Sequence, residues 1–448
     1  MARTDGDTSS KGVNMESTPA NTSPTNGDNP KLDRVLCLGG GATNLTLMSG
    51  ALYTLNQAGL HEPGRGPNVI TMAGAGAVVG LHYLAPKGLK NNVRFSLEAL
   101  ENTINLGVSD AIYEAFPINY KVFTKGGPSA DLFNEFWSSL PEVREAMHQS
   151  GTSDDEALLA DSLLFAGAAM CPTDVNFFSE GVCGHSRFLE EFIDFEALQR
   201  VDPNDIAIEI NAFCIEDHEL VDFTNYECDS DGVPTKDSKG RYIPQAITPD
   251  HLRAALAFPF LHPPYKLDDK HYFEGAAIQC LNDYTIEDAK RLEWVLVLDP
   301  LRKNMIGMPQ NLWDAFALSI LMPTVGLTEL GRLILESKDG FLHSGLAQTD
   351  EFAALAKKLK QLSASQDRKL NPFELMVLLA DRATPNKKEP SELYGAEFHI
   401  PDDKVRAAWG WSRSSMKDLF SIGKEAGTQL AIEMYGKRHI GLKGVSAP

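Results

Sequence analysis

The residues most informative about chemistry lie in a segment that reads as a strand, a tight turn and a helix. Residues 68–80 begin with an apolar run and continue into small residues on either side of Gly74. A nucleophile elbow has this pattern, because small neighbours allow a serine to occupy a sharp bend with its hydroxyl exposed. The central residue here is Gly74, which has no side chain that could attack a substrate. The segment therefore predicts the backbone of a hydrolytic site without its nucleophile.

A second glycine cluster consists of Gly39, Gly40 and Gly41, which follow the apolar run 34–38 and precede a helical pattern. A strand that leads into glycines at the N-terminus of a helix presents backbone N–H groups to an anion. The anion is either a phosphate or the oxyanion of acyl transfer. The residues after Ala42 fit neither a dinucleotide-binding motif nor a P-loop. Close packing of strand on helix would by itself explain either glycine cluster.

A third segment lies far downstream, where small residues at 254–257 lead into a proline-rich stretch at 258–265 and then to Glu274 and Gly275. The three segments, in this order, resemble the patatin-like phospholipase family. Members of that family have a glycine-triplet oxyanion loop, a Gly-x-Ser-x-Gly elbow after the next strand, and a distant Asp-Gly motif that carries the dyad acid.

The resemblance implies a three-layer α/β/α fold with a mainly parallel central sheet, carried by residues 33–300. The runs at 206–210 and 221–223 are similar to the family's central pair of strands, and the run at 294–298 is similar to its final strand. Residues 84–190 are largely helical by pattern and form either a lid over the cleft or an ordinary part of the core. Beyond the resemblance, residues 301–448 predict a mainly helical C-terminal extension.

The chain departs from the family at the reactive positions. Gly74 stands where the family has its serine, and Glu274 stands where it has the aspartate of the dyad. The glycines that shape the scaffold are retained: Gly39, Gly40, Gly41, Gly76 and Gly275. Retained scaffold with altered reactive side chains is the pattern expected of a fold that has lost or replaced its original chemistry.

The resemblance also implies a ligand-binding loop and a candidate acid or base. The loop residues are Gly39, Gly40, Gly41, Ala75 and Gly76. The N–H groups of Gly40, Gly41 and Ala75 are the expected oxyanion donors.

Glu274 is the candidate general acid or base, because an apolar cleft would raise the pKa of its carboxyl. The candidate side chains for assisting Glu274 are Thr71, Ser49, His82 and Cys280, although residues of these types more often serve packing.

Composition excludes several classes of partner. The chain has 448 residues, enough for one large domain or two, and its 41 basic and 61 acidic side chains give a net charge of −20. A chain this acidic is a poor binder of nucleic acid and is repelled by anionic membrane surfaces. No apolar run reaches the ~18–20 residues that a membrane-spanning helix needs.

The cysteines and the N-terminal segment point to a reducing compartment. Six cysteines have irregular spacing with no zinc-binding pattern, and we expect neither a metal nor an organic cofactor. Residues 1–32 are polar, contain no secretory signal pattern, and are expected to be disordered. We therefore expect a cytoplasmic protein.

Three functions are compatible with these residues. The first is a patatin-fold protein that lacks the serine nucleophile and binds a fatty-acyl or other apolar small molecule in the former lipase cleft. The second is an enzyme with altered chemistry, in which Glu274 activates water as general acid or base. The third is a non-catalytic scaffold for protein interactions. Ordinary serine lipase activity is not expected, since loss of a catalytic serine costs on the order of 10⁶ in turnover. The natural ligand and the oligomeric state remain open.

Overall fold

The elements that position these residues are described by a computed structural model. The structure describes residues 33–62, 64–89, 93–148, 154–229, 232–282, 292–301, 392–401, 404 and 410–436, with scattered residues between 303 and 329. The predicted tail at 1–32 and much of the predicted extension at 301–448 lie outside the described residues. No helix within the described ranges is long and apolar enough to cross a membrane.

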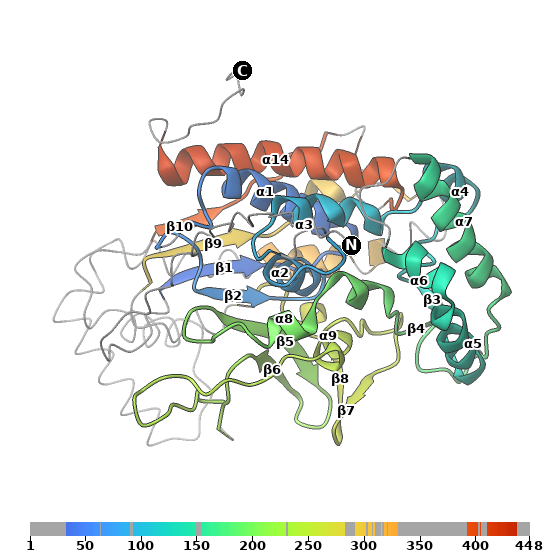
Figure 1. Cartoon of the computed structure of the whole chain (residues 1–448), viewed down its shortest axis with the longest axis horizontal. Coiled ribbons are helices and arrows are strands. Elements are labelled where there is room, and N and C mark those ends of the chain that lie inside the picture. The colour runs from blue at the N-terminus through green and yellow to red at the C-terminus, as the bar shows by residue number, and fades with distance from the viewer. Residues whose placement is uncertain are drawn as a thin grey trace, which may run out of the picture.

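A mainly parallel sheet forms the centre of the molecule (Figure 1). Among the described residues it has eight strands in the order β10-β9-β1-β2-β5-β8-β7, and β6 also pairs with β5. Neighbours from β10 to β5 are parallel, whereas β6 and β8 pair antiparallel with β5, and β7 pairs antiparallel with β8. The strands are β1 (Arg34–Leu38), β2 (Val69–Met72), β5 (Ala207–Cys214), β6 (Glu219–Thr224), β7 (Tyr265–Leu267), β8 (Lys270–Glu274), β9 (Trp294–Leu298) and β10 (Glu392–Gly395), with β3 (Thr124–Lys125) and β4 (Cys183–Gly184) forming a separate pair. The predicted α/β class is confirmed.

The central strands are buried on both faces, which explains their nearly continuous apolar sequences. In β1, Leu36 and Leu38 belong to the main hydrophobic core, while Val35 and Cys37 face a second, smaller cluster. Alternate side chains of a strand point to opposite faces of the sheet, so both faces must be covered. The runs predicted as strands at 34–38 and 294–298 are β1 and β9.

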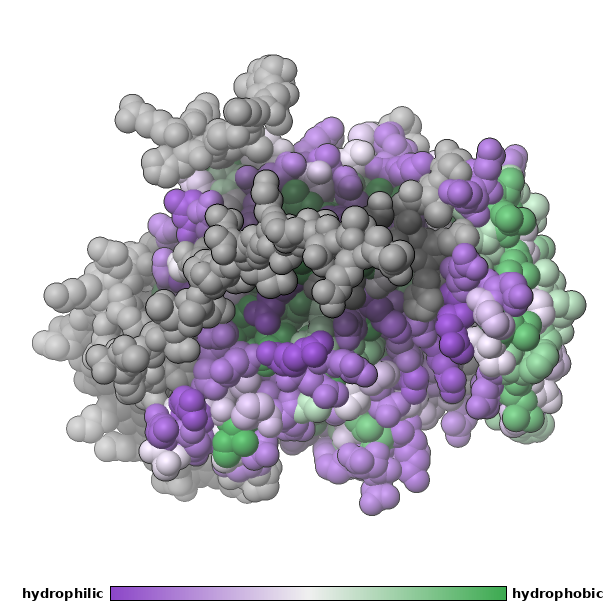
Figure 2. All heavy atoms as spheres, viewed as in Figure 1, coloured by the Kyte–Doolittle hydropathy of each residue, from purple (hydrophilic) through white to green (hydrophobic). Residues whose placement is uncertain are grey.

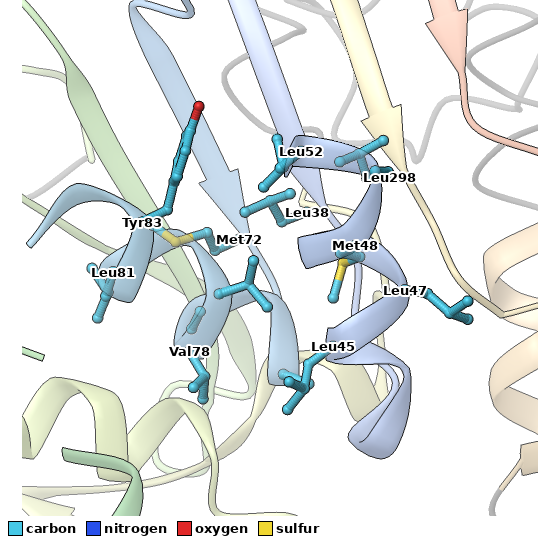
Figure 3. Close-up of a cluster of buried hydrophobic side chains, with 14 of the residues drawn as sticks. Leu38, Leu45, Leu47, Met48, Leu52, Met72, Val78, Leu81, Tyr83 and Leu298 are labelled. Atoms are coloured by element: carbon cyan, nitrogen blue, oxygen red, sulfur yellow. The ribbon is translucent and has the colours of Figure 1, made fainter. Parts of the chain in front are cut away.

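Helices α1 and α2 contribute many of the buried side chains of the main core. Figure 3 shows residues of both helices gathered against Leu38, Met72 and Leu298 of the strands. The helices are α1 (Leu45–Gln57), α2 (Ala75–Leu84), α3 (Leu97–Asn102), α4 (Asp110–Ala115), α5 (Pro128–Ser139), α6 (Pro141–His148), α7 (Asp154–Met170), α8 (Phe195–Leu198), α9 (Pro249–Ala255) and α14 (Arg413–Tyr435). Short 3₁₀ helices are η1 (Ala42–Asn44), η2 (Thr103–Leu106), η3 (Phe188–Phe192), η4 (Gly275–Ala277) and η5 (Lys303–Met305).

Helix α14 packs along α1, although the two are far apart in the sequence (Figure 1). A Cβ atom on Gly50 would overlap the carbonyl oxygen of Phe420, and one on Gly423 would overlap the carbonyl oxygen of Leu47. A Cβ atom on Gly427 would likewise come within 2.5 Å of a carbonyl oxygen of α1. Since real Cβ atoms do not approach other atoms this closely, the two backbones can touch only because these positions are glycines.

The C-terminal region also contributes a strand. Residues Glu392–Gly395 form β10, which pairs in parallel with β9 and extends the sheet beyond the region of family resemblance. We predicted a mainly helical region here, and four residues that end in a glycine give no strand signal. These residues form a strand because they pair with the edge strand β9, although their own sequence has little preference for a strand.

The region predicted to be helical at 84–190 contains α3 to α7. A buried ion pair fastens α7 to the segments before it: Lys121 Nζ lies 3.1 Å from Asp161 Oδ1. The second oxygen, Asp161 Oδ2, accepts hydrogen bonds from the Ser109 backbone N–H at 2.6 Å and from its hydroxyl at 2.8 Å. The insert is therefore held by a carboxylate whose two oxygens are both bonded.

Candidate functional site

Three segments that are distant in the sequence meet at the carboxyl ends of β1 and β2. A Cβ atom on Gly40 would lie 2.8 Å from Ala276 Cβ, and one on Gly76 would lie 2.8 Å from the Gly39 carbonyl oxygen. The Gly40 N–H donates to the Cys280 carbonyl oxygen at 3.1 Å. Glycine is needed here because the segments approach too closely for side chains.

Glu274 reaches this point because of how strands share the edges of β5. Strand β2 pairs with Ala207–Ile210 of β5, and β8 pairs with the end of β5, where Ala212 is opposite Glu274. Strand β6 pairs with Glu209–Cys214 of β5, which overlaps the residues paired with β2 and those paired with β8. Strand β6 therefore lies along one edge of β5, and β2 and β8 share the opposite edge. Since β2 and β8 run in opposite directions along one edge, the turn after β2 faces the end of β8.

The turn after β2 places Gly74 directly against Glu274. Gly74 has φ 47° and ψ −121°, in a region of positive φ that strains any residue with a side chain. A Cβ atom on Gly74 would overlap Glu274 Oε1 and would lie 2.9 Å from Glu274 Cδ and 3.1 Å from Ala276 Cβ. The carboxyl of Glu274 therefore fills the volume that a side chain at position 74 would need.

The environment of the Glu274 carboxyl favours its neutral form. The residue keeps some accessible surface, yet its carboxyl is surrounded closely enough that burial raises its pKa to about 8. No group in the described part of the chain donates a hydrogen bond to this carboxyl. At neutral pH the group is therefore mostly protonated and can donate a hydrogen bond.

Two backbone N–H groups beside the site have no hydrogen-bond partner among the described residues: those of Gly41 and Ala75. Ala75 is the first residue of α2, where the N-terminus of the helix carries a partial positive charge. The Gly39 and Gly40 N–H groups are already bonded, to the carbonyl oxygens of Leu298 and Cys280. The oxyanion role stays a prediction, and Gly40 would have to release its present acceptor to take part.

Of the side chains suggested as assistants, only Cys280 lies at this junction. A Cβ atom on Gly40 would be 3.8 Å from Cys280 Sγ, and burial raises the pKa of that thiol to about 12. Such a thiol is unreactive because it remains protonated.

The other three suggested side chains have structural surroundings. Ser49 Oγ donates to the Leu45 carbonyl within α1 at 3.0 Å. His82 is buried between the carbonyl oxygens of Phe192 and Ala99, at 2.6 and 2.8 Å. Thr71 is fully buried in β2, and its hydroxyl has no partner among the described residues.

Two buried asparagines near the site were not predicted from the sequence. Asn211 Nδ2 donates to the Gln279 carbonyl at 2.9 Å, and a Cβ atom on Gly275 would lie 2.6 Å from Asn211 Oδ1. Asn44, three residues after Gly41, is completely buried, and neither polar atom of its amide has a partner in the described residues. Unsatisfied buried amides are rare, so Asn44 is a candidate ligand contact. Only the polarity of an asparagine at the start of an apolar helix signals it in the sequence.

The described residues contain no group of three or more His, Cys, Asp or Glu side chains placed to hold a metal ion. The site is therefore built from one carboxyl, backbone N–H groups and a buried amide. Such a set can bind a polar head group and can move one proton.

Comparison with known proteins identifies one family and several similar solved structures. The family model for patatin-like phospholipase matches residues 36–286. Among solved structures, VipD from Legionella pneumophila is similar, with 11% sequence identity and a TM-score of 0.32, over 90% of this chain and 67% of that chain. No curated protein matches. The matched range includes the glycine triplet, the turn at Gly74 and Glu274.

Proposed function

The chain belongs to the patatin-like phospholipase family, and we propose that it binds a fatty-acyl or other apolar small molecule at Glu274 without serine-type hydrolysis. The observation that carries this proposal is the overlap between a side chain at position 74 and the Glu274 carboxyl. A serine at position 74 would require the carboxyl end of the Glu274 side chain to move. This overlap supports the proposal that the two departures from the family belong together.

The groups around Glu274 favour a particular kind of ligand head. A protonated carboxyl donates a hydrogen bond, and the free N–H groups of Gly41 and Ala75 are also donors. Donors together with the N-terminus of α2 suit an oxygen that carries partial negative charge. We therefore propose a ligand with a carboxyl, ester or amide carbonyl at its head and an apolar chain behind it.

A second function is favoured by one further observation, the raised pKa of Glu274. A carboxyl with a pKa of about 8 and no partner among the described residues is present in both protonation states near neutral pH. Proton transfer is most efficient from groups of this kind. In this alternative Glu274 accepts a proton from a water molecule that attacks a bound carbonyl.

Mass spectrometry of small molecules released from the purified chain separates the two functions. The native chain is compared with Glu274→Gln, which keeps the shape of the side chain but cannot exchange a proton. Glu62→Gln, at an exposed position, is the matched control. A ligand carried by all three proteins supports the binding function. A ligand that the native chain and the control convert, and that Glu274→Gln keeps intact, supports the acid–base function.

Restoring the family's residues provides an independent test. Gly74→Ser alone is expected to remain inactive on p-nitrophenyl butyrate, because the new side chain overlaps Glu274. Gly74→Ser combined with Glu274→Asp removes one methylene from the acid, restores the family's pair and is expected to produce measurable ester hydrolysis. Absence of a bound ligand from every protein, together with an inactive double variant, would overturn the proposed function.

A further inference from the structure

The outer flank of the helical insert exposes large apolar side chains. We define the insert flank as Leu132 and Phe136 of α5, Leu159 and Met170 of α7, and Phe177 and Phe178 of the loop that follows α7. Figure 2 shows green side chains gathered along the edge of the molecule formed by α4, α5 and α7, with purple ones beside them. Isolated exposed apolar residues are ordinary, whereas a gathered set marks an interaction surface.

Helix α7 is packed in the opposite sense from an ordinary surface helix. Its buried side includes Ala157, Ala160 and Gly167, whereas Leu159 is 74% exposed and Met170 is also exposed. A Cβ atom on Gly167 would overlap the indole ring of Trp137 on α5. The buried apolar positions of this helix are thus small residues, while Phe165 is half-buried against Phe116 and Tyr120 and the large residues Leu159 and Met170 are exposed. Since burial of large apolar side chains is favourable, this face is shaped for contact with something outside the described chain.

The two aromatic rings at the end of the flank are presented by an ordered turn. Phe177 is 95% exposed and Phe178 is 91% exposed, and their ring centroids lie 5.7 Å apart. The Phe178 N–H donates to Asn176 Oδ1 at 2.9 Å. The Ser129 N–H, at the start of α5, donates to Asp174 Oδ2 at 2.7 Å, which fixes the loop beside that helix.

The negative charge around Phe177 and Phe178 indicates which kind of lipid surface these rings can contact. Residues 125–182 contain ten acidic and two basic side chains, and the whole chain has a net charge of −20. An anionic lipid surface is repelled by such a region. A quaternary ammonium group is attracted by carboxylates and also binds the faces of aromatic rings. The phosphocholine head group places that cation at the outside of the lipid surface.

We propose that the insert flank docks on a zwitterionic lipid surface with phosphocholine head groups. Phe177 and Phe178 insert among the head groups, and the exposed leucine, phenylalanine and methionine of α5 and α7 lie against the acyl boundary. This inference goes beyond the proposed ligand site and does not depend on it.

The docked flank would be connected to the candidate site through the backbone. The Val182 N–H donates to the Phe260 carbonyl at 3.1 Å, and the Cys183 N–H donates to the Leu261 carbonyl at 2.7 Å. The Glu274 N–H donates to Ala257, a few residues earlier in the same segment, at 2.9 Å. A surface bound at Phe178 is therefore linked by few residues to the strand that ends at Glu274.

Co-sedimentation of the full chain with sucrose-loaded vesicles tests the proposal. Vesicles of dioleoylphosphatidylcholine are compared with vesicles of dioleoylphosphatidylglycerol. We expect the native chain to bind the choline vesicles, and the Phe177→Ser/Phe178→Ser variant to bind roughly tenfold less. The Leu159→Ser/Met170→Ser variant is expected to lose binding in the same direction. Val233→Ser removes an exposed apolar side chain outside the flank and is the matched control.

Several outcomes would overturn the proposal. These are no binding to choline vesicles, stronger binding to phosphatidylglycerol vesicles, or equal binding by the flank variants and the native chain. A fourth contradicting outcome comes from sedimentation equilibrium: the native chain binds no vesicles but forms a dimer, and both flank variants are monomers. That result would assign the flank to self-association. Circular dichroism of each variant confirms that it is folded, and the ligand carried at Glu274 is measured separately, so the two proposals fail independently.

Discussion

Two of the carboxyl groups that this protein encloses, Asp161 and Glu274, have completely different surroundings. Asp161 in the insert receives hydrogen bonds from Ser109 and an ion pair from Lys121. Glu274 at the elbow has no donor among the described residues, and burial raises its pKa to about 8. One fold therefore contains both a satisfied acid and an unsatisfied one.

The difference indicates which of the two acids serves the architecture. A buried acid that holds elements together is given partners, because an unpaired charge in the interior is costly. An enclosed acid without partners stabilises the fold less than an apolar residue would. The presence of Glu274 is understandable if a ligand provides its hydrogen-bond partner or a proton neutralises its charge.

The largest effect is expected from breaking the satisfied acid. Asp161→Ala leaves the Lys121 ammonium buried without its counter-charge, and removal of one partner of such a pair typically costs about 3–5 kcal/mol of unfolding free energy. Chemical denaturation measures the loss. Asp155→Ala, at an exposed position of the same helix, is the control and is expected to change stability by no more than about 0.5 kcal/mol. If Asp161→Ala and Asp155→Ala changed stability equally, Asp161 would not be a stabilising acid, and its contrast with Glu274 would disappear.

The next largest effect concerns Glu274 and has the opposite sign. The pKa of its carboxyl is raised from 4.5 to about 8 in the folded chain, so the folded state binds the proton more tightly than the unfolded state. The stability that this proton provides is fully present below pH 4.5 and is lost as the pH rises through 8. Glu274→Gln does not titrate, and it should gain on the order of 3 kcal/mol relative to the native chain between pH 5 and pH 9.

Denaturation of both proteins at several pH values checks this expectation. A constant stability difference across the range would mean that the carboxyl is hydrated and ionised in the folded chain. In that case both acids would have hydrogen-bond partners, Asp161 from protein groups and Glu274 from water.

A smaller effect is expected from filling the space beside Glu274. Gly74→Ala introduces a Cβ atom that overlaps the carboxyl at a backbone position with φ 47°, and we expect a loss of about 1–3 kcal/mol. Combining it with Glu274→Ala should recover part of the loss, with a coupling energy of about 0.5–3 kcal/mol in a double-mutant cycle. Strictly additive effects would show that the two positions do not compete for space.

The smallest effect is expected at Thr71, whose buried hydroxyl is another polar group without a partner among the described residues. Thr71→Val replaces its buried hydroxyl with a methyl group of the same shape and should stabilise the fold by up to about 1 kcal/mol. Thr224→Val is the matched control, because the Thr224 hydroxyl donates to the Tyr226 carbonyl and its removal should cost about 1 kcal/mol. Thermal unfolding of the two variants tests this: the midpoint temperature should rise for Thr71→Val and fall for Thr224→Val.

Much of the frame was accessible from the sequence. The glycine triplet, the turn at Gly74 and Glu274 could be placed together because strand and helix patterns and a family resemblance fixed their order. Strands β1 and β9 were predictable because buried parallel strands are apolar throughout. The convergence of these segments follows from the parallel connections between them.

Other features depend on three-dimensional neighbours that no local pattern encodes. The overlap of Glu274 with position 74 arises because β2 and β8 meet along one edge of β5. The bond from the Gly40 N–H to the Cys280 carbonyl removes a donor that the sequence had left available. Strand β10 exists because β9 offers it an edge. In each case the deciding partner is a backbone group far away in the sequence.

The contact between α1 and α14 sets the order in which the protein can be finished during synthesis. Helix α1 is separated from the glycine triplet only by η1, yet the helix that packs along it, through Gly423 and Gly427, lies near the end of the described chain. A ribosome must therefore translate hundreds of further codons before the first-made part of the site acquires its permanent support. Until then, the face of α1 that α14 covers in the folded protein lacks its partner helix.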